Sequence, residues 1–221
     1  FHSFEDLLAI FALGAMVALP LAEIVIRPFI PGGIPGSIPF VQHLTLWVGF
    51  LGAALAARHG KLIALATASF IPDGSIRRAT ELFSATVAAI VSAVLARAAV
   101  DIVAIEMDIG AEIALGVHTW VFQLVLPVSF IAIALRLMWR AGGWRARGVA
   151  ASGIIFALWL VPSFEILAGM AGWWIVVLVI VAALAGAPIF TVLGGLAVFL
   201  YMTEAIDPAT VPLYAYDLAT E

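Results

Sequence analysis

The chain has 221 residues, a formal net charge of -4 at pH 7 and no cysteine, and 65% of its residues are hydrophobic while only 11% are charged. Because soluble domains carry about 25% charged residues, this composition excludes a water-soluble fold. The lack of cysteine excludes a disulfide framework and a thiolate-held metal or iron–sulfur site, and the basic residues form no groove-sized cluster that would bind nucleic acid.

The hydrophobic residues form blocks near or above the roughly 20 residues that an α-helix needs to cross a bilayer. These blocks are apolar all round and do not alternate with period two, which excludes a transmembrane β-barrel. Helices are then the only way to satisfy the backbone in lipid. The sequence therefore predicts an all-α, polytopic transmembrane protein with about six membrane spans plus one interfacial amphipathic helix.

The first span is predicted at residues 7–26, where Pro20 should bend the helix. Glu23, near its end, is placed to pair with Arg27 one turn later. The Pro- and Gly-rich segment that follows cannot continue a helix and forms a loop. The second span is predicted at residues 39–57.

The next segment, residues 62–72, is too short to cross the membrane, and the following Pro-Asp-Gly turn closes it. It is therefore predicted to be an interfacial amphipathic helix. The third span, residues 79–105, carries Arg97 and Asp101 four residues apart, so that both lie on one helix face. As a pair they suggest either an ion relay or a charge pair that makes burial tolerable, near a helix neighbour or the outer headgroups.

The fourth and fifth spans are predicted at residues 113–135 and 149–170. The last apolar stretch, residues 172–201, is longer than one crossing needs, and Gly186-Ala187-Pro188 interrupt it. It is either one long kinked helix or two broken half-helices. A transport site built from broken helices usually shows two such breaks in related halves, so the single break favours a kink in a scaffold helix.

The distribution of Lys and Arg predicts the orientation. Eight of the ten lie in residues 58–78 or 136–147, two regions that two crossings separate. Basic loops stay in the cytoplasm, so both regions and the N-terminus are expected there. The loop after Arg27, the acidic loop at residues 106–112 and the turn at Glu165 are then outside.

The end of the second span carries a resemblance to a known family. After Arg27, Gln42 and Trp47 lead into GFLGAALAARHGKLI. This pattern resembles the small, Q-type membrane subunit of tripartite ATP-independent periplasmic (TRAP) transporters, although Gln42 and Leu62 replace the residues that are usual there. The residues that match, together with the paired arginines that follow the surface segment, are Gly52, Ala53, Ala54, Ala56, Arg58, Gly60, Arg77 and Arg78.

A second resemblance lies near the C-terminus. The segment LVIVAALAGAPIFTVLGGLAVFL, with Gly186 and Pro188, is similar to the first helix of the large, M-type subunit of the same transporters. The two resemblances imply a Q-type subunit in residues 1–147, a connecting transmembrane helix in residues 148–171 and the start of an M-type subunit in residues 172–221.

The resemblance implies a scaffold part of a sodium-coupled secondary transporter that imports an organic acid such as a dicarboxylate. A periplasmic solute-binding protein would deliver the substrate, and the elevator-type M-type subunit, fused or separate, would carry it. The sodium and substrate sites would lie in the part of that subunit that follows Glu221. This chain is then expected to hold no cofactor or metal, and to lie in a bacterial or archaeal inner membrane.

No nucleophile, base and orienting group occur together, so an enzyme is not expected. His43, His59 and His118 leave open a haem- or quinone-associated membrane anchor, because membrane haem is held by paired histidines. A stand-alone multispan protein is a third alternative. The candidate scaffold, lipid or interface residues are Arg27, Gln42, Trp47, Gly52, Arg58, Lys61, Arg77, Arg78, Arg97, Asp101, Gly186 and Pro188.

Overall fold

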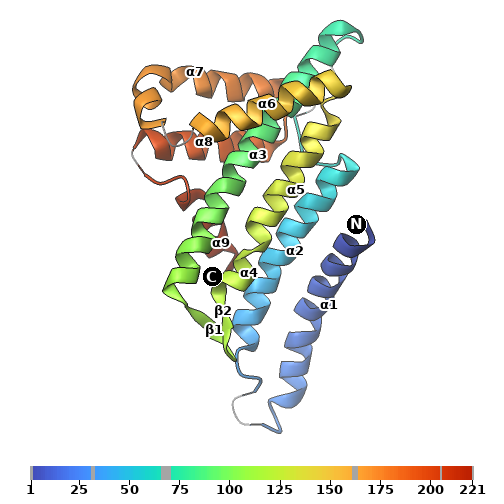
Figure 1. Cartoon of the computed structure of the whole chain (residues 1–221). Coiled ribbons are helices and arrows are strands. Elements are labelled where there is room, and N and C mark those ends of the chain that lie inside the picture. Colours follow the sequence, from blue (N-terminus) through green and yellow to red (C-terminus); the bar gives the residue numbers. More distant parts are fainter. Residues whose placement is uncertain (1, 31–32, 66–70, 161–163, 205, 221) are drawn as a thin grey trace.

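The computed structural model describes the backbone of residues 2–30, 33–65, 71–160, 164–204 and 206–220 (Figure 1). It confirms the all-α class, with one short β-hairpin inserted. The helices are α1 (His2–Ile26), α2 (Ser37–His59), α3 (Ser75–Ile109), α4 (Thr119–Gln123), α5 (Val125–Arg140), α6 (Trp144–Leu160), α7 (Phe164–Leu184), α8 (Ile189–Thr203) and α9 (Thr210–Thr220). The strands are β1 (Glu112–Ala114) and β2 (Val117–His118).

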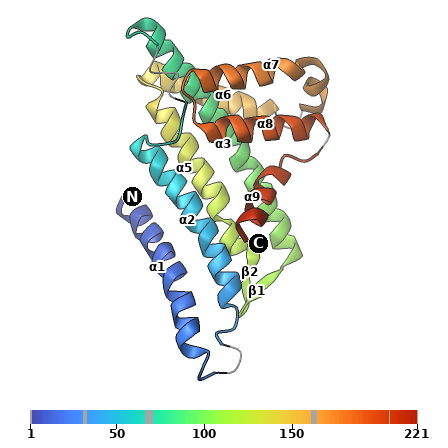
Figure 2. The same ribbon diagram turned by 180° about the vertical axis from the view of Figure 1, so that it is seen from behind.

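Four long segments form the main bundle, and they run side by side in both views (Figures 1 and 2). They correspond to the first four predicted spans. Each is long and apolar enough to cross a bilayer, and they cover Phe4–Ile26, Ser37–His59, Ser75–Ile109 and Thr119–Arg140. Their ends place residues 58–61, 71–78 and 136–147 at one end of the bundle, and residues 27–30 and the β-hairpin at the other (Figure 1).

The fourth span begins at Thr119 and not at residue 113 as predicted. The reason is the hairpin of β1 and β2, whose turn has positive φ at Leu115 (55°) and Gly116 (77°). A residue in this left-handed conformation cannot belong to a right-handed helix, so the helix starts only after the turn. Because residues 113–118 are mostly apolar, hydropathy alone did not reveal this turn.

α3 lies at the centre of the fold and packs against α5, α6, α7, α8 and α9. Its buried face is rich in alanine, including Ala88, Ala89 and Ala99, none of which is exposed. Small side chains let helices approach closely, which suits packing in a membrane. α1 differs, because it packs mainly on α2 and leaves most of its apolar side chains exposed.

The segment after α2 differs from the predicted interfacial helix at residues 62–72. Residues 62–65 and 71–72 are not helical, and residues 66–70 lie outside the described part of the chain. Instead, Ala64 forms an antiparallel bridge with Pro188, and the amide of Ile189 donates to the carbonyl of Ile63 at 2.8 Å. These backbone bonds hold Ile63 and Ala64 against the start of α8.

α6, α7 and α8 lie across the long bundle near its basic end, and do not extend it (Figures 1 and 2). The predicted single helix at residues 149–170 is therefore wrong in its limits, since α6 ends at Leu160 and α7 begins at Phe164. Residues 161–163 lie outside the described residues. Among the residues searched, α8 (Ile189–Thr203) is apolar but, at 15 residues, shorter than a span.

The predicted break at residues 186–188 is confirmed, but it is not a kink. α7 and α8 turn back on each other as a helical hairpin and pack side by side (Figures 1 and 2). Gly186 has φ 95°, which only glycine adopts freely, and Pro188 cannot donate the backbone bond that would continue the helix. The reversal follows from these two residues together.

The C-terminal tail contains a helix that the sequence analysis did not predict. α9 begins after Asp207, whose carboxylate accepts a hydrogen bond from the amide of Ala209 at 2.8 Å. Such a side-chain contact is typical of a helix start. α9 packs against α2 and α3, with Pro212 and Tyr216 buried.

Candidate functional site

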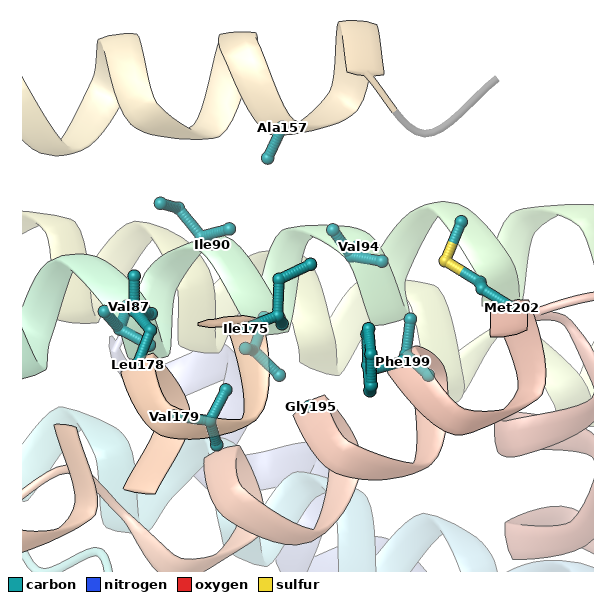
Figure 3. Close-up of a pocket in the computed structure, with 12 residues that line it drawn as sticks. Val87, Ile90, Val94, Ala157, Ile175, Leu178, Val179, Gly195, Phe199 and Met202 are labelled. Atoms are coloured by element: carbon teal, nitrogen blue, oxygen red, sulfur yellow. The ribbon is translucent and has the colours of Figure 1, made fainter. Parts of the chain in front are cut away.

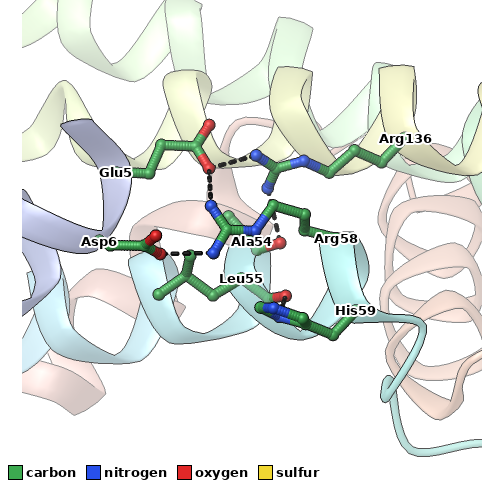
Figure 4. Close-up of polar contacts among 7 residues, drawn as sticks. All are labelled: Glu5, Asp6, Ala54, Leu55, Arg58, His59 and Arg136. Carbon is green, nitrogen blue, oxygen red and sulfur yellow. Dashed lines mark hydrogen bonds and ion pairs between the residues drawn. The ribbon is translucent and has the colours of Figure 1, made fainter. Parts of the chain in front are cut away.

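A cluster of four charged residues joins three helices at the basic end of the bundle (Figure 4). Nη2 of Arg58 on α2 lies 2.5 Å from Oδ1 of Asp6 on α1, and Nη1 of Arg58 lies 3.7 Å from Oε2 of Glu5. Arg136 on α5 pairs with the same Glu5 oxygen and donates from Nη1 to the carbonyl of Ala54 at 2.6 Å. Glu5 is thus held between two arginines from different helices.

The positions of these charges suit the helices that carry them. Glu5 and Asp6 lie at the start of α1 and Arg58 lies in the last turn of α2, so each faces the helix dipole that favours its sign. The side chains of Arg58 and Arg136 are only 16% and 18% exposed, which limits screening by solvent. The cluster therefore adds a link to α5 for α1, which otherwise packs mainly on α2.

A second polar contact lies in the other half of the bundle and holds α9. Nε2 of His43 lies 2.5 Å from the hydroxyl of Tyr216, and Nδ1 of His43 lies 2.7 Å from the carbonyl of Pro39. Because a carbonyl only accepts, Nδ1 donates to Pro39, and the neutral ring then accepts from Tyr216 at Nε2. The Gln123 side chain also hydrogen-bonds to Tyr216.

The environment of Tyr216 keeps its hydroxyl protonated. Burial raises the pKa of Tyr216 to about 12, with a smaller contribution from the negative charge of Glu106. A neutral phenol is the donor that Nε2 of His43 needs. The contact is further packed by Phe122, whose ring centroid lies 5.1 Å from that of His43. Nearby, the indole of Trp47 donates to the carbonyl of Phe122 at 2.9 Å, which ties α2 to α4.

Glu23 organises the loop between α1 and α2. Its carboxylate accepts the amide of Ile34 at 2.7 Å and lies 3.9 Å from Arg27, the pair expected from the sequence. Gly33 sits against this carboxylate with φ 66°. A pocket of about 300 Å³ beside them is lined by Pro20, Glu23, Ile24, Arg27, Ser37, Ile38, Val41 and Gln42.

Arg97 and Asp101 form the expected ion pair on one face of α3. Their side chains are 54% and 40% exposed, so the pair is not buried within the described part of the chain. Arg97 lies 19 residues after Arg78, which is about 28 Å along a helix and close to the thickness of a hydrocarbon core. This spacing supports a position near the opposite headgroups and gives no sign of a relay across the membrane.

The other predicted residues are scattered. Arg77 pairs with Asp73 at 2.5 Å and with Glu81 at 3.1 Å on the exposed start of α3. Lys61 and Arg78 are exposed at the same end of the bundle, and Gly52 faces outward with open space where a Cβ would be. Gly186 and Pro188 form the turn of the α7–α8 hairpin. The structure thus brings only Arg58, among these candidates, into the charge cluster.

Sequence reasoning missed Glu5, Asp6, Arg136 and Tyr216 as partners. The acidic pair at the start of a span and the arginine at the end of another are visible in the sequence, and opposite charges at the same membrane side were a usable signal. The contact between α9 and α2 left no such signal, because the tail was not predicted to be a helix.

The histidines do not support a haem pair. Both ring nitrogens of His43 are engaged, and Nδ1 of His59 lies 2.9 Å from the carbonyl of Leu55 in its own helix. His118 lies on β2, with Nε2 3.9 Å from Glu112. Among the described residues that were searched, no three His, Cys, Asp or Glu side chains are grouped so that they could hold a metal ion.

Comparison with known proteins identifies a family to which the chain is similar. Residues 16–146 match the family model described as tripartite ATP-independent periplasmic transporters, DctQ component. This match covers more than half of the chain and contains α2 to α5 together with residues 16–26 of α1. No curated protein matches the chain.

Proposed function

The chain belongs to the DctQ component family of tripartite ATP-independent periplasmic transporters, and from this premise we propose that it is the scaffold against which the large transporter component works. It is a multi-pass membrane protein of a transporter and not an enzyme. DctQ components assemble with a large DctM component and a periplasmic binding protein. The proposal assigns this chain a supporting part in that assembly.

The observation that carries the proposal is that side-chain contacts between helices tie the bundle together. At one end, α1, α2 and α5 are joined by the charge cluster of Glu5, Asp6, Arg58 and Arg136. Towards the other end, Trp47 joins α2 to α4. The charged groups of the cluster form ion pairs with one another, as expected in a rigid support. A carrier of substrate and ions would instead need inward-facing polar groups free to bind them.

We further propose how the transport cycle uses this scaffold. The imported solute is an organic acid, sodium drives its uptake, and both bind in the large component, which moves like an elevator against this scaffold. The basic end faces the cytoplasm together with the N-terminus, since Lys and Arg concentrate in cytoplasmic loops. Residues 172–221 are the start of an M-type subunit, joined to the Q-type part through α6 and the beginning of α7, and the turn at Gly186 and Pro188 supports that reading.

The experiment that tests the scaffold role is co-purification from detergent. A tagged chain should retain the large component. Arg136→Gln should reduce the amount retained, because it removes the ion pair between Arg136 on α5 and Glu5 on α1. Arg77→Gln is the matched control, since its partners Asp73 and Glu81 are exposed and lie close to it in sequence at the start of α3. A wild-type chain that is well folded yet never retains a large component contradicts the proposal.

A further inference from the structure

An apolar pocket of about 200 Å³ lies between α3, α6, α7 and α8 (Figure 3). Every residue that lines it is apolar, among them Ile90 and Val94 on α3, Ala157 on α6 and Met202 on α8. An apolar cavity of about 150 Å³ stays dry and takes up apolar molecules. The pocket is therefore suited to hydrocarbon and offers nothing to a polar solute.

The depth of the pocket matches the position of an acyl chain. Along α3, Val87 and Val94 lie nine and sixteen residues after Arg78, which corresponds to about 14 and 24 Å. The midplane of a bilayer lies about 20 Å from the headgroup level. A lipid whose headgroup sits beside Arg78 thus reaches the pocket with the inner part of its tail.

Charge complementarity indicates which headgroup would bind. α6 passes close to α3, since a Cβ on Gly153 would lie 3.0 Å from Ile90, and both helices start at the basic end of the bundle (Figures 1 and 2). Arg78 and Arg145 are exposed near these two starts. Within the described residues neither has an ion pair. Two free cations above an apolar pocket favour an anionic headgroup.

We propose that this site binds one anionic phospholipid, with an acyl chain in the apolar pocket and its phosphate beside Arg78 and Arg145. A helix of a partner protein does not fit, because a helix with its side chains is about 10 Å wide and exceeds so small a pocket. The site is separate from the charge cluster of Glu5 and Arg136, and it does not depend on the transported solute.

Native mass spectrometry of the delipidated, full-length protein tests the site, with phosphatidylglycerol or phosphatidylcholine added. One phosphatidylglycerol should be retained at concentrations where phosphatidylcholine is lost. Arg78→Gln and Arg145→Gln should each weaken this retention about fivefold. Ala157→Trp and Met202→Trp fill the pocket from two different helices and should abolish retention of either lipid (Figure 3).

Matched controls separate the site from general lipid binding. Ile155→Trp puts the same bulk on an exposed position of α6, and Arg27→Gln removes a cation at the opposite end of the bundle, so both should bind as the wild type does. Circular dichroism shows which variants are folded. Equal retention of the two lipids by the wild type, or unchanged retention in either folded pocket variant, overturns the proposal. If neither pocket variant folds, the arginine variants decide, and unchanged retention in both overturns it.

Discussion

Nη2 of Arg58 lies 2.5 Å from Oδ1 of Asp6, and this contact joins the end of α2 to the start of α1 across 52 residues of sequence. The two side chains are 16% and 43% exposed, so the pair lies at the edge of the packed bundle. Glu5, one residue earlier, extends the same contact to Arg136 on α5. The first helix of this transporter component is therefore held by charge as well as by apolar packing.

Arg136→Gln is expected to lower the stability of the folded protein by about 2 kcal/mol, because it removes a charged hydrogen bond to Glu5 and one to a backbone carbonyl. For a chain of this size, that loss corresponds to a fall in Tm of about 4–8 °C. Thermal unfolding in detergent, followed by intrinsic fluorescence, measures it. Arg77→Gln should leave Tm unchanged, since its partners are exposed. A similar shift in both variants contradicts the account of the cluster.

Tyr216→Phe is expected to release α9. The change removes the hydroxyl that donates to His43 and leaves Nε2 of that ring without its partner, at a cost of about 1–2 kcal/mol. Opening of α9 should then become about 5- to 30-fold more frequent. Amide hydrogen exchange of residues 210–220 measures it. Tyr214→Phe is the control, because Tyr214 is 54% exposed, and equal exchange in the two variants argues against the contact.

The raised pKa of Tyr216, about 12 against an ordinary value of about 10, predicts a pH dependence. The folded protein favours the protonated phenol. The contribution of Tyr216 to the free energy of unfolding is therefore complete below about pH 10 and is lost as the pH rises towards 12. Tyrosinate absorbance is the measurement. The difference between the wild type and Tyr216→Phe should titrate near pH 12, and a midpoint near 10 would show that the phenol is not buried.

Gly33→Ala is expected to disrupt the loop between α1 and α2. Gly33 has φ 66°, and a Cβ there would lie 2.0 Å from Oε1 of Glu23. The carboxylate would have to leave the amide of Ile34, in addition to a backbone strain of about 1–2 kcal/mol. Gly110→Ala has the same backbone strain at φ 68° but no neighbouring atom within 4 Å. It therefore measures the strain alone, without a displaced carboxylate.

Thermal unfolding compares the two glycine variants. Gly33→Ala should lower Tm more than Gly110→Ala, and combining Gly33→Ala with Glu23→Gln should add less than the sum of the single effects, because both changes break the same contact. Equal losses in the two glycine variants would show that the Glu23 carboxylate moves aside freely.

The sequence was sufficient for the fold class and for most of the bundle. Long apolar blocks and their Pro, Gly and charged boundaries predicted α1, α2 and α3, because a membrane span needs about 20 apolar residues whatever its partners. The pairs of Glu23 with Arg27 and of Arg97 with Asp101 were also predictable, since residues four apart share a helix face. The family match over residues 16–146 agrees with the motif at the end of the second span.

The arrangement of the C-terminal third could not be predicted in the same way. Hydropathy shows that α6, α7 and α8 are apolar, but it does not show the direction in which they run. That direction depends on contacts such as Gly194, where a Cβ would lie 2.9 Å from Leu95. The partners of Arg58 and Tyr216 are likewise distant in sequence, so only the packed structure brings them together.

Uptake kinetics in reconstituted vesicles test the central claim most directly. With the large component, the binding protein and an organic acid present, Arg136→Gln should lower the maximal rate in proportion to the assembled complex. The KM for the solute and for sodium should not change, because a scaffold holds neither. A raised KM at an unchanged amount of complex would mean that this chain takes part in binding the solute or the ion, and would contradict the scaffold role.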